Sequence, residues 1–200
     1  MPEHYFTKSP CSKGPVKIIT ALINGATYKF ATTSGIFSKD RVDKGTMLLV
    51  ESVRINKGDK ILDIGCGYGV IGIVFAKQAD SVIMTDVNER AVEFSKTNVK
   101  LNNLDNISVI ESDLYENVKG AGFDKVVCNP PIRAGKNITI KIIEGAKSHL
   151  AKGGKLFLVA RTNQGAKSIA KRMREKFGNE TDINRHSGYR VMLSVKMDQD

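Results

Sequence analysis

Asn129, Pro130 and Pro131 form a short motif whose residue types could act on a nitrogen atom. Consecutive prolines remove two backbone donors and fix φ, so a rigid loop presents the Asn129 side chain and the preceding carbonyl groups. An amide or exocyclic nitrogen is a poor nucleophile because its lone pair is delocalised into a carbonyl group or a ring. The Asn129 side-chain oxygen and the Pro130 carbonyl can each accept one N–H, and fixed dipoles stabilise the positive charge that develops when the nitrogen is alkylated. The motif predicts a catalytic loop at Asn129, Pro130, Pro131 and Ile132, unless it is only a turn that ends a strand.

A glycine-rich segment, DIGCGYG, occupies Asp63–Gly69 and allows two interpretations. Glycines at alternate positions let the backbone turn sharply and approach a ligand closely. Gly67, Gly69 and Gly72 match the G-x-G-x-x-G fingerprint of dinucleotide-binding proteins, with Asp86 downstream. The same loop, counted from Asp63, matches the D-x-G-x-G-x-G pattern of S-adenosylmethionine-dependent methyltransferases.

Carboxylates at three predicted strand ends favour the methyl donor. Asp86 can accept hydrogen bonds from both ribose hydroxyls, a role that would suit NAD equally well. Asp113 can accept a hydrogen bond from the adenine amine, and Asp63 can hold the methionine ammonium directly or through water. A donor that carries an ammonium and a sulfonium fits this set, whereas a pyrophosphate prefers bare N–H groups at a helix N-terminus.

The elements that must position these residues begin with a predicted β-hairpin. Val16–Ile23 and Thr27–Thr32 are β-rich and flank Asn24-Gly25, a strong signal for a type I′ turn. A short amphipathic helix follows at Gly45–Val53. Strands then alternate with helices, which predicts βαβ units and a mostly parallel sheet covered on both faces. The predicted strands are Lys60–Ile64, Ser81–Thr85, Ile107–Glu111, Phe123–Cys128 and Lys155–Ala160, and the predicted helices are Val70–Gln78, Glu89–Leu101, Ile138–Leu150 and Gln164–Phe177.

The last two predicted strands, Glu180–Asn184 and Arg190–Lys196, enclose Ser187-Gly188 and leave no room for a crossover helix, so they should pair antiparallel. The expected fold is α/β: a Rossmann-like, doubly wound sheet of seven strands with an antiparallel C-terminal hairpin, plus the N-terminal β-hairpin. We expect one domain over residues 1–200, with the hairpin and lead-in helix in 1–55 and the cofactor-binding and catalytic core in 56–200.

Composition excludes several other classes of protein. The chain has 200 residues, 41% of them hydrophobic and 26% charged, which is typical of a globular domain and not of a disordered or collagen-like chain. No apolar run reaches the length of a transmembrane helix, and no secretory signal is expected at the N-terminus. Cys11, Cys66 and Cys128 form neither a disulfide framework nor a metal-ligand pattern, so we expect no metal and a cytoplasmic location.

The net charge of +10 is unevenly distributed. Residues 61–132 are net acidic, whereas residues 133–177 hold 12 Lys and Arg against 2 acidic residues. An acidic centre beside basic segments is what an enzyme acting on a polyanion would need, because Lys and Arg release counterions from phosphates. The alternative is that exposed helices use Lys for solubility alone.

The chain resembles the class I methyltransferases of the "methyltransferase small" domain family, which includes bacterial guanine-N2 methyltransferases of small-subunit ribosomal RNA and compact archaeal relatives. The similarity extends over about residues 16–196 and beyond the pocket motifs, because Ser34–Ser38, Val42–Gly45 and Leu48-Leu49 look like the segment that leads into the family's cofactor domain. With this resemblance, the expected S-adenosylmethionine contacts are Asp63, Gly65, Cys66, Gly67, Gly69, Asp86, Val87, Asp113, Leu114, Asn129 and Phe37.

This sequence departs from the family pattern in two ways. Many amine methyltransferases have an aromatic residue after Asn-Pro-Pro that stacks on the target base, whereas Ile132 stands here. Phe37 and Tyr189 are candidates for that stacking. The ribosomal enzymes are also tandem proteins whose extra domain helps to place the substrate, and this chain has one domain.

Basic residues near the predicted catalytic loop point to RNA as the partner. The candidates are Arg133, Lys136, Lys141, Arg161 and Lys167. Such groups could hold phosphates while a base is extruded into the pocket, and structured RNA is usually attacked where bases already splay out. Lys171, Arg172, Arg174 and Lys176 more simply form a solvated helix surface.

Three functions therefore remain open. The first is methylation of an exocyclic amine in RNA, with guanine N2 of ribosomal RNA as the leading target. The second is methylation of a protein glutamine amide, since such enzymes also use an Asn-Pro-Pro loop, although the basic segments favour RNA. The third is an NAD(P)-linked oxidoreductase, which would leave Asn129–Pro131 and Asp113 without a role. The RNA could be bound free or as part of an assembled ribosomal particle.

Overall fold

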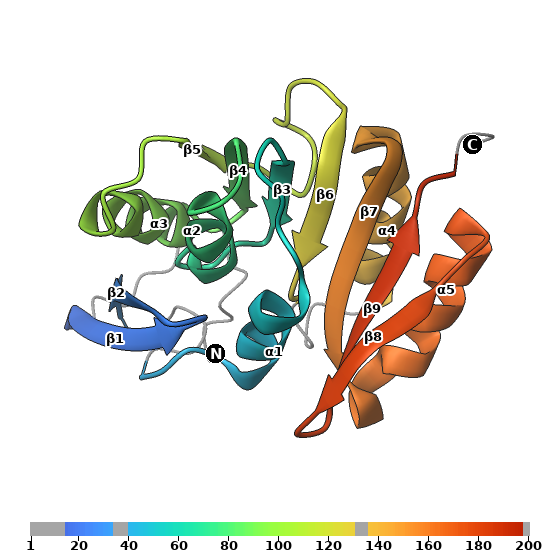
Figure 1. Cartoon of the computed structure of the whole chain (residues 1–200), viewed down its shortest axis with the longest axis horizontal. Coiled ribbons are helices and arrows are strands. Elements are labelled where there is room, and N and C mark those ends of the chain that lie inside the picture. The colour runs from blue at the N-terminus through green and yellow to red at the C-terminus, as the bar shows by residue number, and fades with distance from the viewer. Residues whose placement is uncertain (1–14, 34–39, 131–135, 198–200) are drawn as a thin grey trace.

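The computed structural model describes residues 15–33, 40–130 and 136–197. Strands and helices alternate through most of this chain (Figure 1). In chain order they are β1 (Lys17–Ile23), β2 (Ala26–Thr32), α1 (Lys44–Ser52), β3 (Lys60–Ile64), α2 (Val70–Ala76), β4 (Ser81–Asp86), α3 (Glu89–Leu101), β5 (Ile107–Glu111), β6 (Phe123–Cys128), α4 (Lys136–His149), β7 (Leu150–Arg161), a π-helical turn (Thr162–Ala166), α5 (Lys167–Phe177), β8 (Thr181–His186) and β9 (Tyr189–Val195).

Seven strands form one mixed sheet in the order β5-β4-β3-β6-β7-β9-β8. The pairs from β5 to β7 are parallel, whereas β9 runs antiparallel to both β7 and β8. This arrangement confirms the expected fold class, including the antiparallel pair at the C-terminus. The carboxyl ends of β3, β4 and β6 therefore meet at one edge of the sheet, which lies at the bottom in Figure 1.

Two apolar clusters cover opposite faces of the sheet, because successive strand residues point to opposite sides. Val127 and Phe157 belong to the cluster that includes residues of α1, α2 and α3. Their neighbours Val126 and Leu156 belong to the cluster that includes residues of α4 and α5. The sheet is thus covered on both faces, as near-continuous apolar strands predict.

The N-terminal hairpin forms a separate two-stranded sheet of β1 and β2. Asn24 and Gly25 have φ values of 51° and 77°, so both turn residues adopt the left-handed conformation that a type I′ turn requires. The turn predicted from this residue pair is confirmed.

Two asparagines, Asn98 in α3 and Asn102 at its C-terminal cap, fasten the hairpin to the rest of the domain. Asn98 accepts from the Ala31 amide at 2.7 Å and donates to the Ala31 and Tyr68 carbonyls at 3.0 and 2.8 Å. One turn further along α3, Asn102 makes the same pair of bonds to the amide and carbonyl of Lys29, at 3.2 and 2.8 Å. Because Tyr68 belongs to the glycine loop, Asn98 links the hairpin directly to that loop.

Several element boundaries differ from those expected. β7 begins at Leu150, five residues before the predicted Lys155, because Leu150 already pairs with Phe123 of β6 and the Gly153 amide donates to the Lys196 carbonyl at 2.9 Å. The predicted helix Gln164–Phe177 begins as α5 only at Lys167, because Gln164 and Gly165 have non-helical backbone angles inside the π-helical turn, with φ of 95° at Gly165. These differences leave the strand order unchanged.

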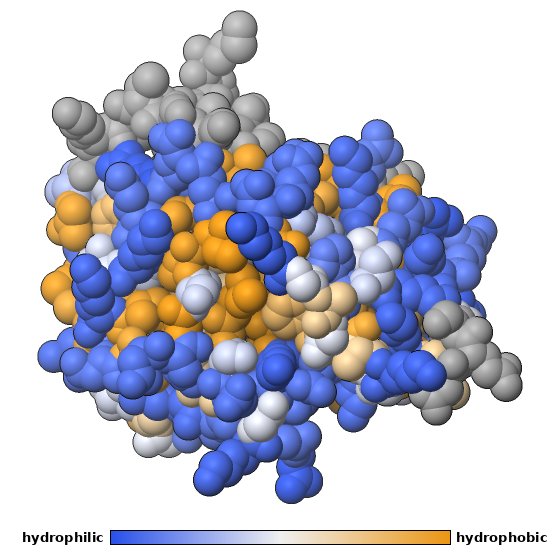
Figure 2. Space-filling view, turned by 90° about the horizontal axis from the view of Figure 1, so that it is seen from above, coloured by the Kyte–Doolittle hydropathy of each residue, from blue (hydrophilic) through white to orange (hydrophobic). Residues whose placement is uncertain are grey.

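The surface seen from above is mostly hydrophilic, and hydrophilic side chains surround one broad hydrophobic area (Figure 2). On the hairpin, the outward-facing residues Val16, Ile18 and Leu22 are 62–69% exposed. No helix in the described part of the chain is both long and apolar enough to cross a membrane.

Candidate active site

The glycine loop connects β3 to α2 at the carboxyl edge of the sheet. Gly65 and Gly67 have φ values of 70° and 60°, and a Cβ built on either residue would meet no atom within 4 Å. Gly72 has a different role, because a Cβ there would lie 2.3 Å from the Met84 sulfur, so its small size lets α2 pack closely on β4. The loop therefore presents bare backbone to open space, which suits a bound ligand.

Asp63 lies beneath this loop and is fully buried. Its Oδ2 accepts from the Gly72 amide at 3.0 Å in the first turn of α2, whereas its Oδ1 has no hydrogen-bond partner among the described residues. Burial raises the pKa of Asp63 to about 7; the bond from Gly72 opposes this shift and the charge of Asp86 adds to it. A buried carboxylate oxygen without a partner is costly in an isolated protein, and it is a natural acceptor for a cationic ligand.

Asp86 ends β4 beside the loop and is 4% exposed. Its Oδ2 accepts from the Gly67 amide and its Oδ1 from the Asn88 amide, both at 2.9 Å. Burial raises its pKa to about 6, and the bonds from Asn88, Gly67 and Val87 oppose the shift. Asp86 therefore fixes the shape of the loop. Each carboxylate oxygen keeps further capacity to accept a bond from a ligand hydroxyl.

Asp113 follows β5 and is exposed, so its carboxylate is accessible from solvent. The Ser112 amide donates to the Asp86 carbonyl at 2.9 Å, which holds the end of β5 next to the end of β4. Leu114, whose φ is 52°, is partly buried and packs against the apolar cluster under α4 and α5. Val87, which follows β4, is half-buried. The predicted donor-site residues at these strand ends thus lie along one edge of the sheet.

Asn129, directly after β6, is held by contacts that the sequence did not predict. Its side-chain NH₂ donates to Asp43 Oδ2 at 3.1 Å and to Thr46 Oγ1 at 2.9 Å. Asp43 precedes α1 and Thr46 lies in its first turn, so α1 reaches the motif across more than 80 residues of chain. The side-chain carbonyl oxygen of Asn129 has no partner among the described residues and is available as an acceptor.

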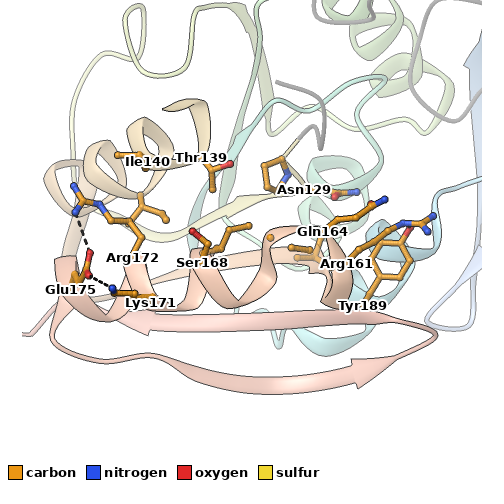
Figure 3. A pocket seen from close by; sticks show the side chains of 16 residues that line it. Asn129, Thr139, Ile140, Arg161, Gln164, Ser168, Lys171, Arg172, Glu175 and Tyr189 are labelled. Atoms are coloured by element: carbon orange, nitrogen blue, oxygen red, sulfur yellow. Dashed lines mark hydrogen bonds and ion pairs between the residues drawn. The ribbon is translucent and has the colours of Figure 1, made fainter. Parts of the chain in front are cut away.

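Asn129 lies between two cavities. A small cavity of about 30 Å³ is lined by the glycine loop together with Asp43, Thr46 and Asn129. A larger cavity of about 580 Å³ begins at Asn129 and Pro130 and continues along α4, the end of β7 and α5. Its volume falls in the usual range for ligand pockets. Asn129 lines both cavities, and Figure 3 shows it at one end of the larger one.

Arg161 and Tyr189 lie at the same end of the larger cavity as Asn129 (Figure 3). Arg161 donates from Nε to the Tyr189 hydroxyl at 3.0 Å, and its guanidinium lies 5.0 Å from the centre of the Tyr189 ring. The Tyr189 hydroxyl in turn donates to Asp43 Oδ1 at 3.3 Å. Tyr189 is 5% exposed, so it forms part of the pocket wall.

The other end of the cavity carries paired charges. Lys171 and Arg172 contact Glu175 at 3.8 and 3.3 Å, and Arg172 also bridges to Glu144 of α4. Lys171 and Arg172 thus form ion pairs at the surface of α5. This resembles the solvated helix surface that the sequence predicts for these residues.

The remaining predicted site residues are scattered. Lys167 and Lys141 are exposed on α5 and α4 and do not line either cavity, and Lys136 is the first residue of α4. The other predicted contacts, namely Phe37, Pro131, Ile132 and Arg133, lie outside the described residues.

Cys66 and Cys128 are buried, and burial raises the pKa of both thiols well above the usual value, so neither is poised as a nucleophile. Within the residues that the structure describes, no group of three or more His, Cys, Asp or Glu side chains could hold a metal ion.

Comparison with known proteins assigns the family. The methyltransferase small domain matches residues 27–193. The "Uncharacterized protein YbxB" of Bacillus subtilis is 36% identical over 98% of this chain and 100% of its own length. The "Ribosomal RNA small subunit methyltransferase C" of Pectobacterium atrosepticum is 40% identical over 68% of this chain and 40% of its own length.

Among solved structures, the T. thermophilus 16S rRNA N2 G1207 methyltransferase (RsmC), in complex with AdoMet and guanosine, is 27% identical with a TM-score of 0.84. The match covers 94% of this chain and 52% of that one, so the chain spans about half the length of these ribosomal RNA methyltransferases or less. The chain belongs to the methyltransferase small domain family, the S-adenosylmethionine-dependent methyltransferases that its glycine loop and Asn-Pro-Pro motif predict.

Proposed function

We propose that the protein transfers the methyl group of S-adenosylmethionine to the exocyclic amine of a nucleobase in RNA, with guanine N2 in ribosomal RNA as the target. The observation that carries this proposal is the position of Asn129: it lines both cavities, its NH₂ is occupied, and its carbonyl oxygen is available.

The residues of the glycine loop fit S-adenosylmethionine. Asp63 offers a buried carboxylate oxygen without a partner, which an ammonium group would satisfy. Gly65 and Gly67 present bare backbone, and Asp86 and Asp113 add carboxylates for hydroxyl and amine donors. We propose that these residues hold the cofactor together with Cys66, Gly69, Val87, Leu114, Phe37 and Asn129. When bound, the cofactor supplies a methyl group attached to a sulfonium sulfur. Once the methyl group is transferred, the rest of the cofactor is a neutral thioether.

Asn129 would act on the nitrogen that accepts the methyl group. Its carbonyl oxygen and the Pro130 carbonyl accept the two N–H groups of the amine and direct the nitrogen lone pair toward the methyl. As the N–C bond forms, positive charge develops on the nitrogen, and these fixed dipoles stabilise it. The methylated nitrogen then releases one proton. No strong base is needed, because holding the reacting atoms in line supplies much of the catalysis.

Charge and pocket size support a nucleic-acid substrate. Arg161 holds its guanidinium at the end of the pocket where Asn129 lies, and its bond to Tyr189 uses only Nε, so the two terminal nitrogens remain for a phosphate or a base edge. We propose that Arg161 binds RNA together with Arg133, Lys136, Lys141 and Lys167. The relatives named for ribosomal RNA support the choice of RNA and of guanine N2.

The direct test is transfer of radiolabelled methyl groups from S-adenosylmethionine. The purified full chain is incubated with an unmodified transcript of small-subunit ribosomal RNA, with assembled small subunits, and with ribosomal proteins. We expect label in RNA, removed by nuclease and resistant to protease, and released as N2-methylguanosine on digestion to nucleosides.

The protein-amide alternative gives the opposite pattern. Label that protease removes and nuclease leaves would contradict the RNA proposal and identify a protein amide as the acceptor. Label in RNA at a nucleoside other than N2-methylguanosine would retain RNA as the substrate and change the target base.

A further inference from the structure

Asp43 stands at the beginning of α1 and makes more contacts than a helix cap requires. Its Oδ2 accepts from the Gly45 and Thr46 amides at 2.8 and 3.1 Å, which caps the helix. The same oxygen accepts from the Asn129 side chain at 3.1 Å. Its Oδ1 accepts from the Tyr189 hydroxyl at 3.3 Å, so one carboxylate joins α1, the end of β6 and the start of β9.

The carboxylate decides which way the Asn129 amide faces. An ionised carboxylate can only accept hydrogen bonds. The NH₂ of Asn129 must therefore point toward Asp43, since the reversed amide would set its oxygen against Oδ2. The carbonyl oxygen consequently points away from Asp43, with no partner among the residues described.

Thr46, the second partner of Asn129, cannot make this choice. Its hydroxyl accepts from the Asn129 NH₂ at 2.9 Å, but a hydroxyl can equally well donate to an amide oxygen. With Thr46 alone, both orientations of the amide would be satisfied. The orientation therefore depends on Asp43.

We propose that Asp43 is a positioning residue for methyl transfer: it holds the Asn129 amide with the carbonyl oxygen directed at the acceptor amine. The inference rests on the proposed function of Asn129. Asp43 does not touch the reacting atoms; it acts through Asn129.

The test compares Asp43→Ser with Asp43→Asn. Serine caps a helix about as well as aspartate, but its hydroxyl is short and can donate as well as accept, so it no longer fixes the amide. We expect the single-turnover rate constant with S-adenosylmethionine and the ribosomal RNA transcript to fall about tenfold to a hundredfold. Calorimetry should give an unchanged Kd for S-adenosylmethionine.

Asparagine should recover most of the rate that serine loses. Two backbone amides, those of Gly45 and Thr46, face the Oδ2 position, so the asparagine must place its oxygen there and its NH₂ toward Tyr189. That oxygen still accepts from Asn129. Asp40→Ser is the control for lost charge, because Asp40 is an exposed acidic residue near α1 that pairs with Lys17 at 2.9 Å.

The double variant Asp43→Ser/Asn129→Ala separates positioning from a general structural effect. If Asp43 acts through Asn129, its substitution should not slow the reaction further once Asn129 is alanine. Two results would overturn the role of Asp43 and leave that of Asn129 intact. One is a double variant in which the rate losses of the two single variants multiply, and the other is an Asp43→Ser variant that loses no more rate than Asp40→Ser. If Asn129→Ala alone keeps the full rate, the proposed function of Asn129 fails and the inference fails with it.

Discussion

Binding of S-adenosylmethionine should weaken as the pH falls below neutrality, because the donor must meet an ionised Asp63. In the protein without donor, burial raises the pKa of Asp63 to about 7. The carboxyl is then about three quarters ionised at pH 7.5 and about one tenth ionised at pH 6. A cationic donor binds the ionised form of Asp63. Because the pKa of Asp63 is raised, the loss of affinity begins near neutral pH and grows as the pH falls. Ionisation of Asp63 alone would raise Kd about eightfold between these two pH values, and Asp86, whose pKa is about 6, adds to the rise at the lower end.

Calorimetric titration measures this linkage in two ways. Kd is followed from pH 6 to 7.5. The donor's α-amino group, with a pKa of about 7.7–8.0, is partly deprotonated at pH 7.5, which lowers the observed ratio of Kd values to about fivefold to sixfold. At pH 7, repeating the titration in two buffers of different ionisation enthalpy should reveal release of about half a proton. Asp63→Asn is the matched control, because the amide can still accept from the Gly72 amide but cannot ionise. A wild-type Kd that stays constant over this range, without proton release, would refute the placement of the donor ammonium at Asp63.

Three other outcomes are expected. Gly67→Ala places a Cβ in the open space of the loop and should weaken donor binding about tenfold or more by calorimetry, with a folding cost of about 1–2 kcal/mol from its positive φ. Gly72→Ala should instead lower stability by about 1–3 kcal/mol in thermal melting, because its Cβ would lie 2.3 Å from the Met84 sulfur, and should leave donor affinity unchanged. The reverse pattern would contradict the assignment of Gly67 to the donor site and of Gly72 to the packing of α2 on β4. Methyl transfer to RNA should fall steeply with added salt, and Arg161→Ala/Lys167→Ala should reduce the logarithmic slope by about two; a flat response would favour a protein substrate.

Much of the fold follows from local patterns in the sequence. Asn24-Gly25 predicts the hairpin turn because few residue pairs tolerate positive φ at both positions, and the structure has both. The short apolar strands from Lys60 onward predict the parallel sheet because only buried strands read as continuous apolar runs. The start of β7 was missed because Lys152-Gly153-Gly154 resembles a turn, whereas the backbone there already bonds to Lys196.

The candidate site was predictable only in part. The sequence predicts that Asp63, Asp86 and Asn129 lie near one another, because each is at or just after the end of a strand and the carboxyl ends of parallel strands share one edge. Asp43 and Thr46 are 86 and 83 residues away from Asn129 in the sequence. Contacts between residues so far apart produce no periodic pattern in the sequence, so these two could not be predicted. Asp43 carried a local signal, its place before a helix, but that signal indicates only a cap.

The central claim, that Asn129 directs methyl transfer to an amine in RNA, is tested most directly by Asn129→Ala. The single-turnover rate constant for methyl transfer to the ribosomal RNA transcript is measured beside the calorimetric Kd for S-adenosylmethionine. We expect the rate to fall about a hundredfold or more, with a Kd that changes by no more than a few-fold. A rate within a few-fold of wild type, or a loss of donor affinity that matches the loss of rate, would contradict the catalytic role of Asn129 and make it a structural residue of the loop.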